Sequence, residues 1–233
     1  MTTYVVLGCH RSGTSLVAHM LVNLGVHMGN VLVGPNQWNR YGHWEDQDFM
    51  TLNDAILKAA GGEWAQPPPA EVIAAMGPKF ERVIAQLVAL RDQRPVWGWK
   101  DPRTCLTIGL YHPHLEDPRY IRVMRNEKDI VRSLRKRARE AAAVLRKELA
   151  EGKQHKNALL QLSHGTWQAI DWRRMVDEYE RRADMFVAVE KPRVINLCYE
   201  DLMGADARAY VKYLADFCES DQVDEAMNAI ARE

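Results

Sequence analysis

Apolar residues follow two different spacings along the chain. Short runs rich in β-branched and aromatic residues predict buried strands, and we place these at residues 4–7, 96–99, 120–124 and 194–198. Elsewhere apolar residues recur at steps of three or four, and the helices expected from this are at residues 12–24, 48–60, 70–91, 126–152 and 167–189, with two short ones after the last strand. Strands that alternate with helices favour an α/β fold with a central, mainly parallel sheet flanked by helices.

The length of 233 residues suits one domain. We therefore expect residues 1–233 to form a single domain, with a helical insertion around residues 140–166. The first apolar run has the length of a strand and no basic region before it, so we expect no signal peptide. Polar residues interrupt the apolar stretch at residues 16–33, so we expect no insertion into a membrane.

A glycine-rich turn follows the first predicted strand. Residues 8–15 (GCHRSGTS) match the phosphate-binding pattern G-x-x-x-x-G-K-[ST] at both glycines and at the final hydroxyl, but Thr14 replaces the lysine. A strand-loop-helix turn of this kind directs backbone N–H groups and a helix dipole at an anion. In nucleotide triphosphatases the missing lysine contacts the β- and γ-phosphates. The turn therefore predicts a site for another 5′-phosphate group, with Arg11 supplying positive charge; the alternative is an ordinary turn with a surface arginine.

A second candidate phosphate site lies at the end of the third predicted strand. Arg125 ends that strand, and Ser133 follows about two helical turns later. An arginine at a strand end and a hydroxyl on the next helix could together bind a second phosphate. The alternative is a solvated basic helix, because this stretch contains Arg122, Arg125, Lys128, Arg132, Arg135, Lys136, Arg137 and Arg139.

Together, these two segments resemble the sulfotransferases that use 3′-phosphoadenosine 5′-phosphosulfate (PAPS). Residues 10–15 (HRSGTS) are similar to their 5′-phosphosulfate loop, P-[KR]-S-G-T-[TS]. Residues 120–133 (YIRVMRNEKDIVRS) are similar to their 3′-phosphate motif, with the same spacing from Arg to Ser. Residues 97–103 (WGWKDPR) and 199–202 (YEDL) resemble segments of many bacterial members. Arginine at position 11 is closer to the tyrosylprotein sulfotransferases and related bacterial enzymes than to the cytosolic group.

The resemblance implies a P-loop-like, three-layer α/β fold, PAPS as co-substrate, 3′-phosphoadenosine 5′-phosphate (PAP) as its desulfonated product, and no metal. Arg137 also matches an arginine of the tyrosylprotein group. The residues that would hold the co-substrate are His10, Arg11, Ser12, Gly13, Thr14, Ser15, Arg125, Ser133 and Arg137. The acceptor would be a hydroxyl or amine of a carbohydrate, lipid, small molecule or peptide, because one scaffold serves all of these.

Sulfuryl transfer requires a base for the acceptor proton, and positive charge beside the transferring and leaving groups. Arg11 and Lys100 are the expected cations. Arg11 stays protonated, so it would act as an electrostatic clamp and not as a proton donor. The cytosolic members carry a K-T-H segment whose histidine is the base, and a late R-K-G-x-x-G loop. Here the first reads Lys100-Asp101-Pro102 and the second is absent, so the base must come from elsewhere.

We expect the catalytic base to be Glu45. Residues 39–45 (NRYGHWE) are similar to a segment N-x-x-G-[FYW]-[FWY]-E that follows the first helix in many bacterial relatives. The tyrosylprotein group also uses a glutamate after that helix. The alternative role of Glu45 is a local cap or salt bridge, and the competing candidates for the base are His43, Asp46, Asp101 and His10.

Net charge and cysteine content indicate which binding partners and which cellular compartment to expect. Lys plus Arg equals Asp plus Glu, at 31 each, so net charge gives no reason to expect a nucleic acid or a membrane surface as partner. Cysteines occur at positions 9, 105, 198 and 218, without CxxC spacing and without a histidine cluster that would complete a metal site. Unpaired thiols of this kind are typical of a cytoplasmic protein.

Two other functions remain open at this point. The first is a P-loop-type small-molecule kinase, against which the threonine at position 14 argues. The second is a catalytically inactive protein that binds PAPS or PAP, which the missing K-T-H histidine keeps open.

Overall fold

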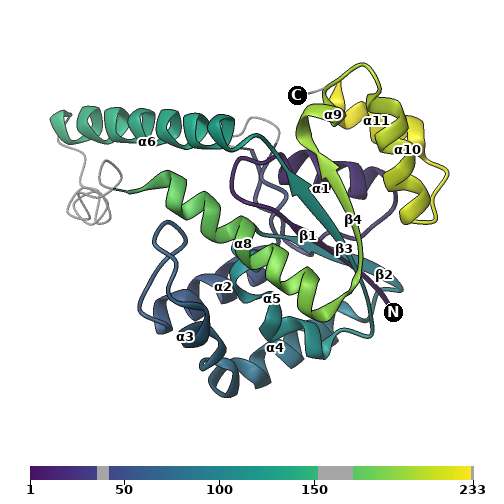
Figure 1. Ribbon diagram of the computed structural model, residues 1–233, viewed down its shortest axis with the longest axis horizontal. Coiled ribbons are helices and arrows are strands. Elements are labelled where there is room, and N and C mark those ends of the chain that lie inside the picture. The colour runs from purple at the N-terminus through teal and green to yellow at the C-terminus, as the bar shows by residue number, and fades with distance from the viewer. Residues whose placement is uncertain (36–41, 152–169, 232–233) are drawn as a thin grey trace.

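A four-stranded parallel sheet crosses the centre of the protein (Figure 1). We describe it from a computed structural model, for residues 1–35, 42–151 and 170–231. The strands lie in the order β2-β1-β3-β4, with the bounds β1 Thr2–Leu7, β2 Val96–Lys100, β3 Asp117–Met124 and β4 Arg193–Cys198. All three strand pairs are parallel, which confirms the predicted sheet.

Helices cover both faces of the sheet and complete three layers (Figure 1). One face packs against helices α1 (Thr14–Asn23), α10 (Ala207–Phe217) and α11 (Val223–Ile230). The other face packs against helices α2 (Gln47–Ala59), α4 (Gly77–Arg91), α5 (Thr104–Tyr111) and α8 (Trp172–Glu190). Side chains of a strand alternate between faces, so Tyr4 and Val6 belong to the first core and Val5 and Leu7 to the second. The predicted three-layer α/β fold is therefore correct.

Three expectations about helices need correction. Residues 70–91 form two helices, α3 (Ala70–Ala74) and α4, because Pro78 lacks the N–H that would bond the carbonyl of Ala74. Helix α8 begins at Trp172, later than expected, and three helices follow β4 because α9 (Tyr199–Leu202) precedes α10.

Helix α5 was not predicted at all. Its residues Thr104, Cys105, Leu106, Thr107, Ile108 and Tyr111 are buried. A helix buried on nearly every side has no polar face, so it produces no three-to-four spacing for a pattern search to find.

Helix α6 (Glu127–Ala150) is the long helix expected after β3, and it extends beyond the body of the protein (Figure 1). Its start is capped, because the Asn126 side chain accepts a hydrogen bond from the backbone N–H of Lys128 at 3.0 Å. The Glu200 side chain of α9 accepts a hydrogen bond from the backbone N–H of Asn126 at 2.9 Å, so α9 contacts the residue that caps α6. The expected helix end at Gly152, and residues 152–166 of the expected insertion, lie outside the described residues.

A buried ion pair fixes the chain just before α2. The Asp46 carboxylate accepts hydrogen bonds from Nε and Nη2 of Arg91 at 3.0 and 2.8 Å, and both side chains are almost fully buried. The same carboxylate accepts from the backbone N–H of Asp48 at 2.9 Å and so caps α2. Arg91 belongs to α4, so the pair ties the loop that contains Glu45 to two helices.

Replacing Arg91 tests this anchor. In Arg91→Met, Asp46 would remain buried without its partner, and we expect a loss of roughly 3–5 kcal/mol in the free energy of unfolding. Urea denaturation measures this loss. Arg208→Met is the matched control, because its ion pair with Asp224 is exposed and should matter little. Equal small losses in the two variants would contradict the structural role of the pair.

Candidate active site

A cavity of about 330 Å³ opens at the carboxyl edge of the sheet, where β1 and β2 end. Ligands of open parallel sheets bind at this edge, because loops and helix N-termini meet there. The cavity is lined by His10, Arg11, Thr14, Ser15, Val33, His43, Glu45, Met50, Trp64, Lys100, Pro102, Arg103 and Arg137. The three expected catalytic residues, which are far apart in sequence, therefore share one cavity.

The turn after β1 has the backbone geometry of an anion site. Arg11 and Gly13 have positive φ angles of 70° and 101°, and Ser12 stabilises the turn by donating to the carbonyl of Cys9 at 2.7 Å. A Cβ at Gly13 would lie 2.4 Å from the ring of Tyr199, so only glycine fits there. Helix α1 begins at the next residue with no acidic side chain in its first turn. Its N-terminal N–H groups are therefore not neutralised by a carboxylate of that turn.

The two predicted phosphate motifs lie in direct contact. Arg11 Nε donates a hydrogen bond to Ser133 Oγ at 2.9 Å, across 122 positions of sequence. Arg125 Nη1 donates to the backbone carbonyl of Arg11 at 3.0 Å, and its guanidinium lies 4.2 Å from the ring centroid of Tyr199. These contacts join the turn after β1 to the end of β3 and to the second turn of α6.

Lys100 and Glu45 form a buried ion pair inside the cavity. Lys100 Nζ donates to Glu45 Oε1 at 2.9 Å and to Ser15 Oγ at 3.3 Å, and Lys100 is only 1% exposed. Ser15 Oγ in turn donates to the backbone carbonyl of His43 at 3.2 Å. Burial raises the pKa of Glu45, but the charges of Lys100 and Arg103 outweigh it and hold that pKa below its usual value. Glu45 is therefore ionised at neutral pH.

Positive charge exceeds negative charge in this cavity. Arg11, Lys100, Arg103 and Arg137 line it together with a single carboxylate, that of Glu45. Burial and the neighbouring charge of Arg11 lower the pKa of Arg137, and Glu45 only partly compensates. A bound anion would stabilise the charged form of Arg137, which its surroundings disfavour. The cavity is therefore suited to a ligand with several negative charges.

The competing candidates for the base divide into two groups. His10 and His43 line the cavity, and burial lowers the pKa of both, so the two imidazoles are neutral near pH 7. Asp46 is held by Arg91, and Asp101 accepts from Asn53 Nδ2 and Arg103 Nη1, each at 2.8 Å. Neither aspartate lines the cavity. Glu45 is thus the one carboxylate among the candidates that faces the ligand space.

The other predicted co-substrate residues are distributed around the cavity. His10, Arg11, Thr14, Ser15 and Arg137 line it. Ser12, Gly13, Arg125 and Ser133 lie outside its lining and reach it through the contacts of the turn and of Arg11. Asn39, which begins the segment used to select Glu45, lies outside the described residues.

Arg103 and Trp64 are among the lining residues that the predicted site did not include. Arg103 also forms ion pairs with Asp54 and Asp101 at 2.8 Å, and its place three residues after Lys100 was the available signal. Trp64 forms an aromatic wall with His10, at 4.6 Å between ring centroids, and no motif surrounds it in sequence. The predicted site therefore lacked the cation Arg103 and the aromatic side chain of Trp64.

Within the described residues, no three His, Cys, Asp or Glu side chains are grouped as metal ligands. None of the helices built from those residues has the length and apolar character needed to cross a membrane.

The parallel sheet, the glycine-containing turn after β1 and the cationic cavity beside it are features of a P-loop-like α/β protein. Comparison with known families makes this more specific. The model of the sulfotransferase family matches residues 4–225, which is nearly the whole chain. The protein therefore belongs to the sulfotransferase family, as its sequence motifs indicated. Among curated proteins, no sequence matches the chain significantly.

The ion pair of Glu45 has a consequence at acid pH. The pKa of Glu45 lies below its usual 4.5, so its contribution to stability is complete above about pH 4.5 and is lost as pH falls through the lowered value. In Glu45→Gln this contribution is absent at every pH. We expect the unfolding free energy of the wild type to fall more steeply below about pH 4.5 than that of the variant. Urea denaturation over that range measures both slopes, and parallel slopes would contradict the ionised pair.

Proposed function

We propose that the protein transfers the sulfuryl group of PAPS to a hydroxyl or amine acceptor. The observation that carries the proposal is the excess of positive charge in a cavity where the two phosphate motifs meet. PAPS carries a 5′-phosphosulfate and a 3′-phosphate, so it needs two anion sites held at a fixed separation. The family supports sulfuryl transfer in general, and these two motifs favour PAPS as the donor.

In this proposal the turn after β1 binds the 5′-phosphosulfate with the N-terminal N–H groups of α1 and with His10, Thr14 and Ser15. Ser133 and Arg125, near the start of α6, bind the 3′-phosphate. Arg137 lies one helical turn after Ser133 and faces the cavity, where its depressed pKa would be restored by the bound anion.

Transfer would be in line. A bond forms between the acceptor oxygen and sulfur, the bond between sulfur and the bridging phosphate oxygen breaks, and PAP leaves. Glu45 takes the acceptor proton, while Arg11 and Lys100 stabilise the charge on the transferring and leaving oxygens.

The Lys100–Glu45 pair gives these two residues a shared role. Lys100 must turn from Glu45 toward the sulfuryl oxygens in order to stabilise them. Glu45 then loses the partner that lowers its pKa most, so its pKa rises. The same movement of Lys100 therefore neutralises the transferring group and makes Glu45 a stronger base.

The alternatives are less well supported. A kinase would need the lysine that Thr14 replaces. A protein that only binds PAPS or PAP would not need a carboxylate in the cavity beside the cations, and Glu45 is there. We assign the protein to the cytoplasm because its four cysteines are free thiols, which suit a reducing compartment. The acceptor would be a carbohydrate, lipid, small molecule or peptide.

PAP should bind without a metal. We expect saturating PAP to raise the melting temperature in the presence of EDTA, since ligand at about a hundred times its dissociation constant adds roughly 2.7 kcal/mol of stability. Differential scanning fluorimetry measures this, with ATP and Mg²⁺ as the comparison. Stabilisation by ATP with Mg²⁺ but not by PAP would contradict the proposal and favour the kinase.

Ser133 should recognise the 3′-phosphate. We expect Ser133→Ala to weaken the binding of PAP by about 1.5–3 kcal/mol, which is the usual contribution of a hydrogen bond to a charged group. The same variant should bind adenosine 5′-phosphosulfate, which lacks the 3′-phosphate, almost normally. Ser15→Ala is the matched control. Ser15 lies in the turn after β1, which is the proposed 5′-phosphosulfate site, so its loss should weaken the binding of both ligands. Equal losses for both ligands in Ser133→Ala, measured by isothermal titration calorimetry, would remove Ser133 from the 3′-phosphate site.

A further inference from the structure

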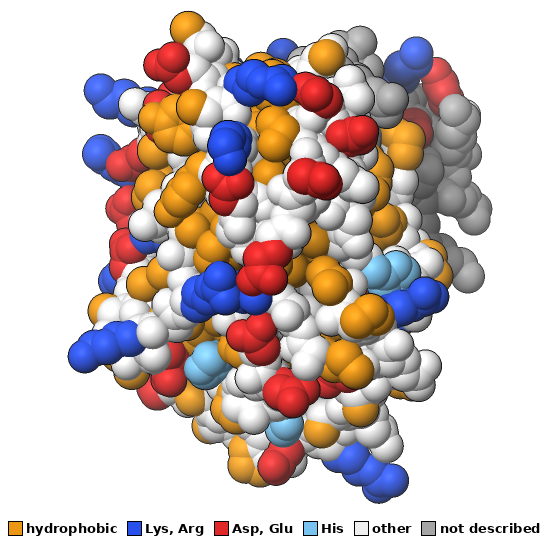
Figure 2. All heavy atoms as spheres, turned by 90° about the vertical axis from the view of Figure 1, so that its right-hand side faces the viewer, with side chains coloured by type: hydrophobic (Ala, Val, Ile, Leu, Met, Phe, Trp, Pro, Cys, Tyr) orange, Lys and Arg blue, Asp and Glu red, His pale blue; other side chains and the backbone are white. Residues whose placement is uncertain are grey.

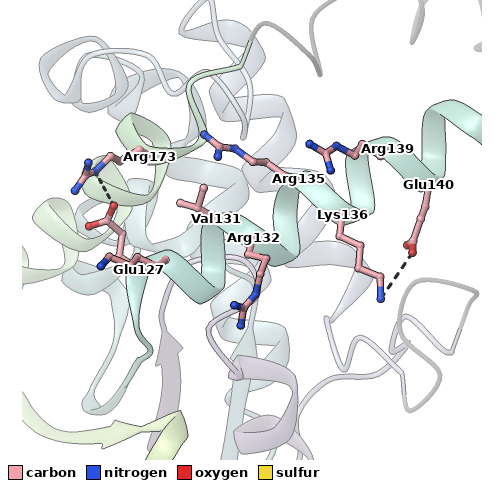
Figure 3. A pocket seen from close by; sticks show the side chains of 9 residues that line it. Glu127, Val131, Arg132, Arg135, Lys136, Arg139, Glu140 and Arg173 are labelled. Carbon is pink, nitrogen blue, oxygen red and sulfur yellow. Dashed lines mark ion pairs between the residues drawn. The ribbon is translucent and has the colours of Figure 1, made fainter.

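A row of basic side chains covers the side of α6 that faces away from Ser133 and Arg137. We call it the α6 basic face, and it consists of Lys128, Arg132, Arg135, Lys136 and Arg139, all exposed. With Arg173 of α8, these residues line a hollow of about 790 Å³ on the surface (Figure 3). This hollow shares no lining residue with the candidate active site.

The charge of this face is local. The whole chain has equal numbers of basic and acidic residues, and Figure 2 shows another face on which the two kinds are interspersed. Two acidic residues, Glu127 and Glu140, line the hollow, and they pair with Arg173 at 2.8 Å and Lys136 at 3.9 Å. The excess of positive charge therefore belongs to α6 and not to the protein as a whole.

Three cations of the face make no ion pair with any described residue: Lys128, Arg135 and Arg139. Figure 3 shows Arg135 and Arg139 extending from α6 side by side. Because they are four residues apart and exposed, these like charges destabilise the helix. An anion bound from outside would remove this cost.

The lining indicates what kind of anion fits. It consists of charged side chains, their aliphatic stems and Val131. It contains no aromatic side chain on which nucleic acid bases could stack. The row from Lys128 to Arg139 spans twelve residues of a regular helix, or about 16 Å from the first to the last, and it presents charge along a stiff line. A stiff polymer with regularly spaced anions loses less conformational entropy on such a line than a flexible acidic peptide would.

We propose that the α6 basic face binds an anionic polysaccharide, through the carboxylate or sulfate groups on its sugar rings. The proposal goes beyond sulfuryl transfer, since this binding needs neither the donor nor the reaction. The two can therefore fail separately.

Binding of a fluorescently labelled heparin oligosaccharide to the full chain, followed by anisotropy at several salt concentrations, tests the proposal. The double variant Arg135→Ala, Arg139→Ala removes two unpaired cations and keeps good helix formers. The matched control is Arg208→Ala, Lys212→Ala, which removes two exposed cations from α10. We expect the α6 variant to bind the oligosaccharide more weakly than the wild type does. The slope of its log affinity against log salt concentration should be smaller in magnitude by about two, because two cations are removed. The control variant should match the wild type in both affinity and slope.

Several results would overturn the proposal: no binding by the wild type, equal changes in the two variants, or no change in the α6 variant. A hyaluronate oligosaccharide, which carries carboxylates without sulfates, serves as the second probe and shows which anion the face prefers. Poly-glutamate and oligothymidylate of matched charge complete the set. Tighter binding of either than of both sugars would also overturn the proposal and indicate an acidic peptide or a nucleic acid as the partner.

Discussion

A lysine and a glutamate buried side by side define the candidate active site. Bringing the charges of Lys100 and Glu45 out of water is costly, and the cost is tolerable only because they pair at 2.9 Å. Each is followed in sequence by a buried aspartate that is anchored elsewhere. Asp46 is held by Arg91 of α4, and Asp101 by Asn53 of α2. These contacts fix the backbone next to Glu45 and the backbone next to Lys100. The position of the ion pair therefore follows from the packing of the helices around it.

The rest of the site follows from this arrangement. Glu45 is the single carboxylate among the residues that line the cavity, against four cations, and burial together with the charge of Arg11 lowers the pKa of Arg137. The hydrogen bond from Arg11 to Ser133 brings α6 against the turn after β1. Helix α6 therefore has two functional sides in this account, one facing the proposed co-substrate and the other, the α6 basic face, directed at solvent.

Local sequence predicted the parts of the structure whose causes are local. The four strands are short apolar runs, and the turn after β1 contains glycines that its backbone requires, so both could be recognised directly. Glu45, Lys100 and Arg11 were expected together through family resemblance, and the structure places all three in one cavity. The roles assigned to them stay predictions.

What could not be predicted depends on tertiary packing. Helix α5 is buried on nearly every side and leaves no periodic pattern. The Arg91–Asp46 anchor joins residues 45 positions apart, and no motif connects them. The same is true of the aromatic wall that Trp64 forms with His10. Such contacts arise only when helices distant in sequence pack on the same sheet.

The proposed reaction is tested by following the transfer of a radiolabelled sulfuryl group from PAPS into a native metabolite extract. We expect labelled products with the wild type, and a rate about 10²–10⁴-fold lower with Glu45→Gln, because a glutamine cannot accept the proton. That variant should keep its affinity for PAP. Identification of the products by mass spectrometry would name the acceptor. Tight binding of PAPS without any labelled product would contradict the proposed sulfuryl transfer, and equal rates for the wild type and Glu45→Gln would contradict the role of Glu45 as the base.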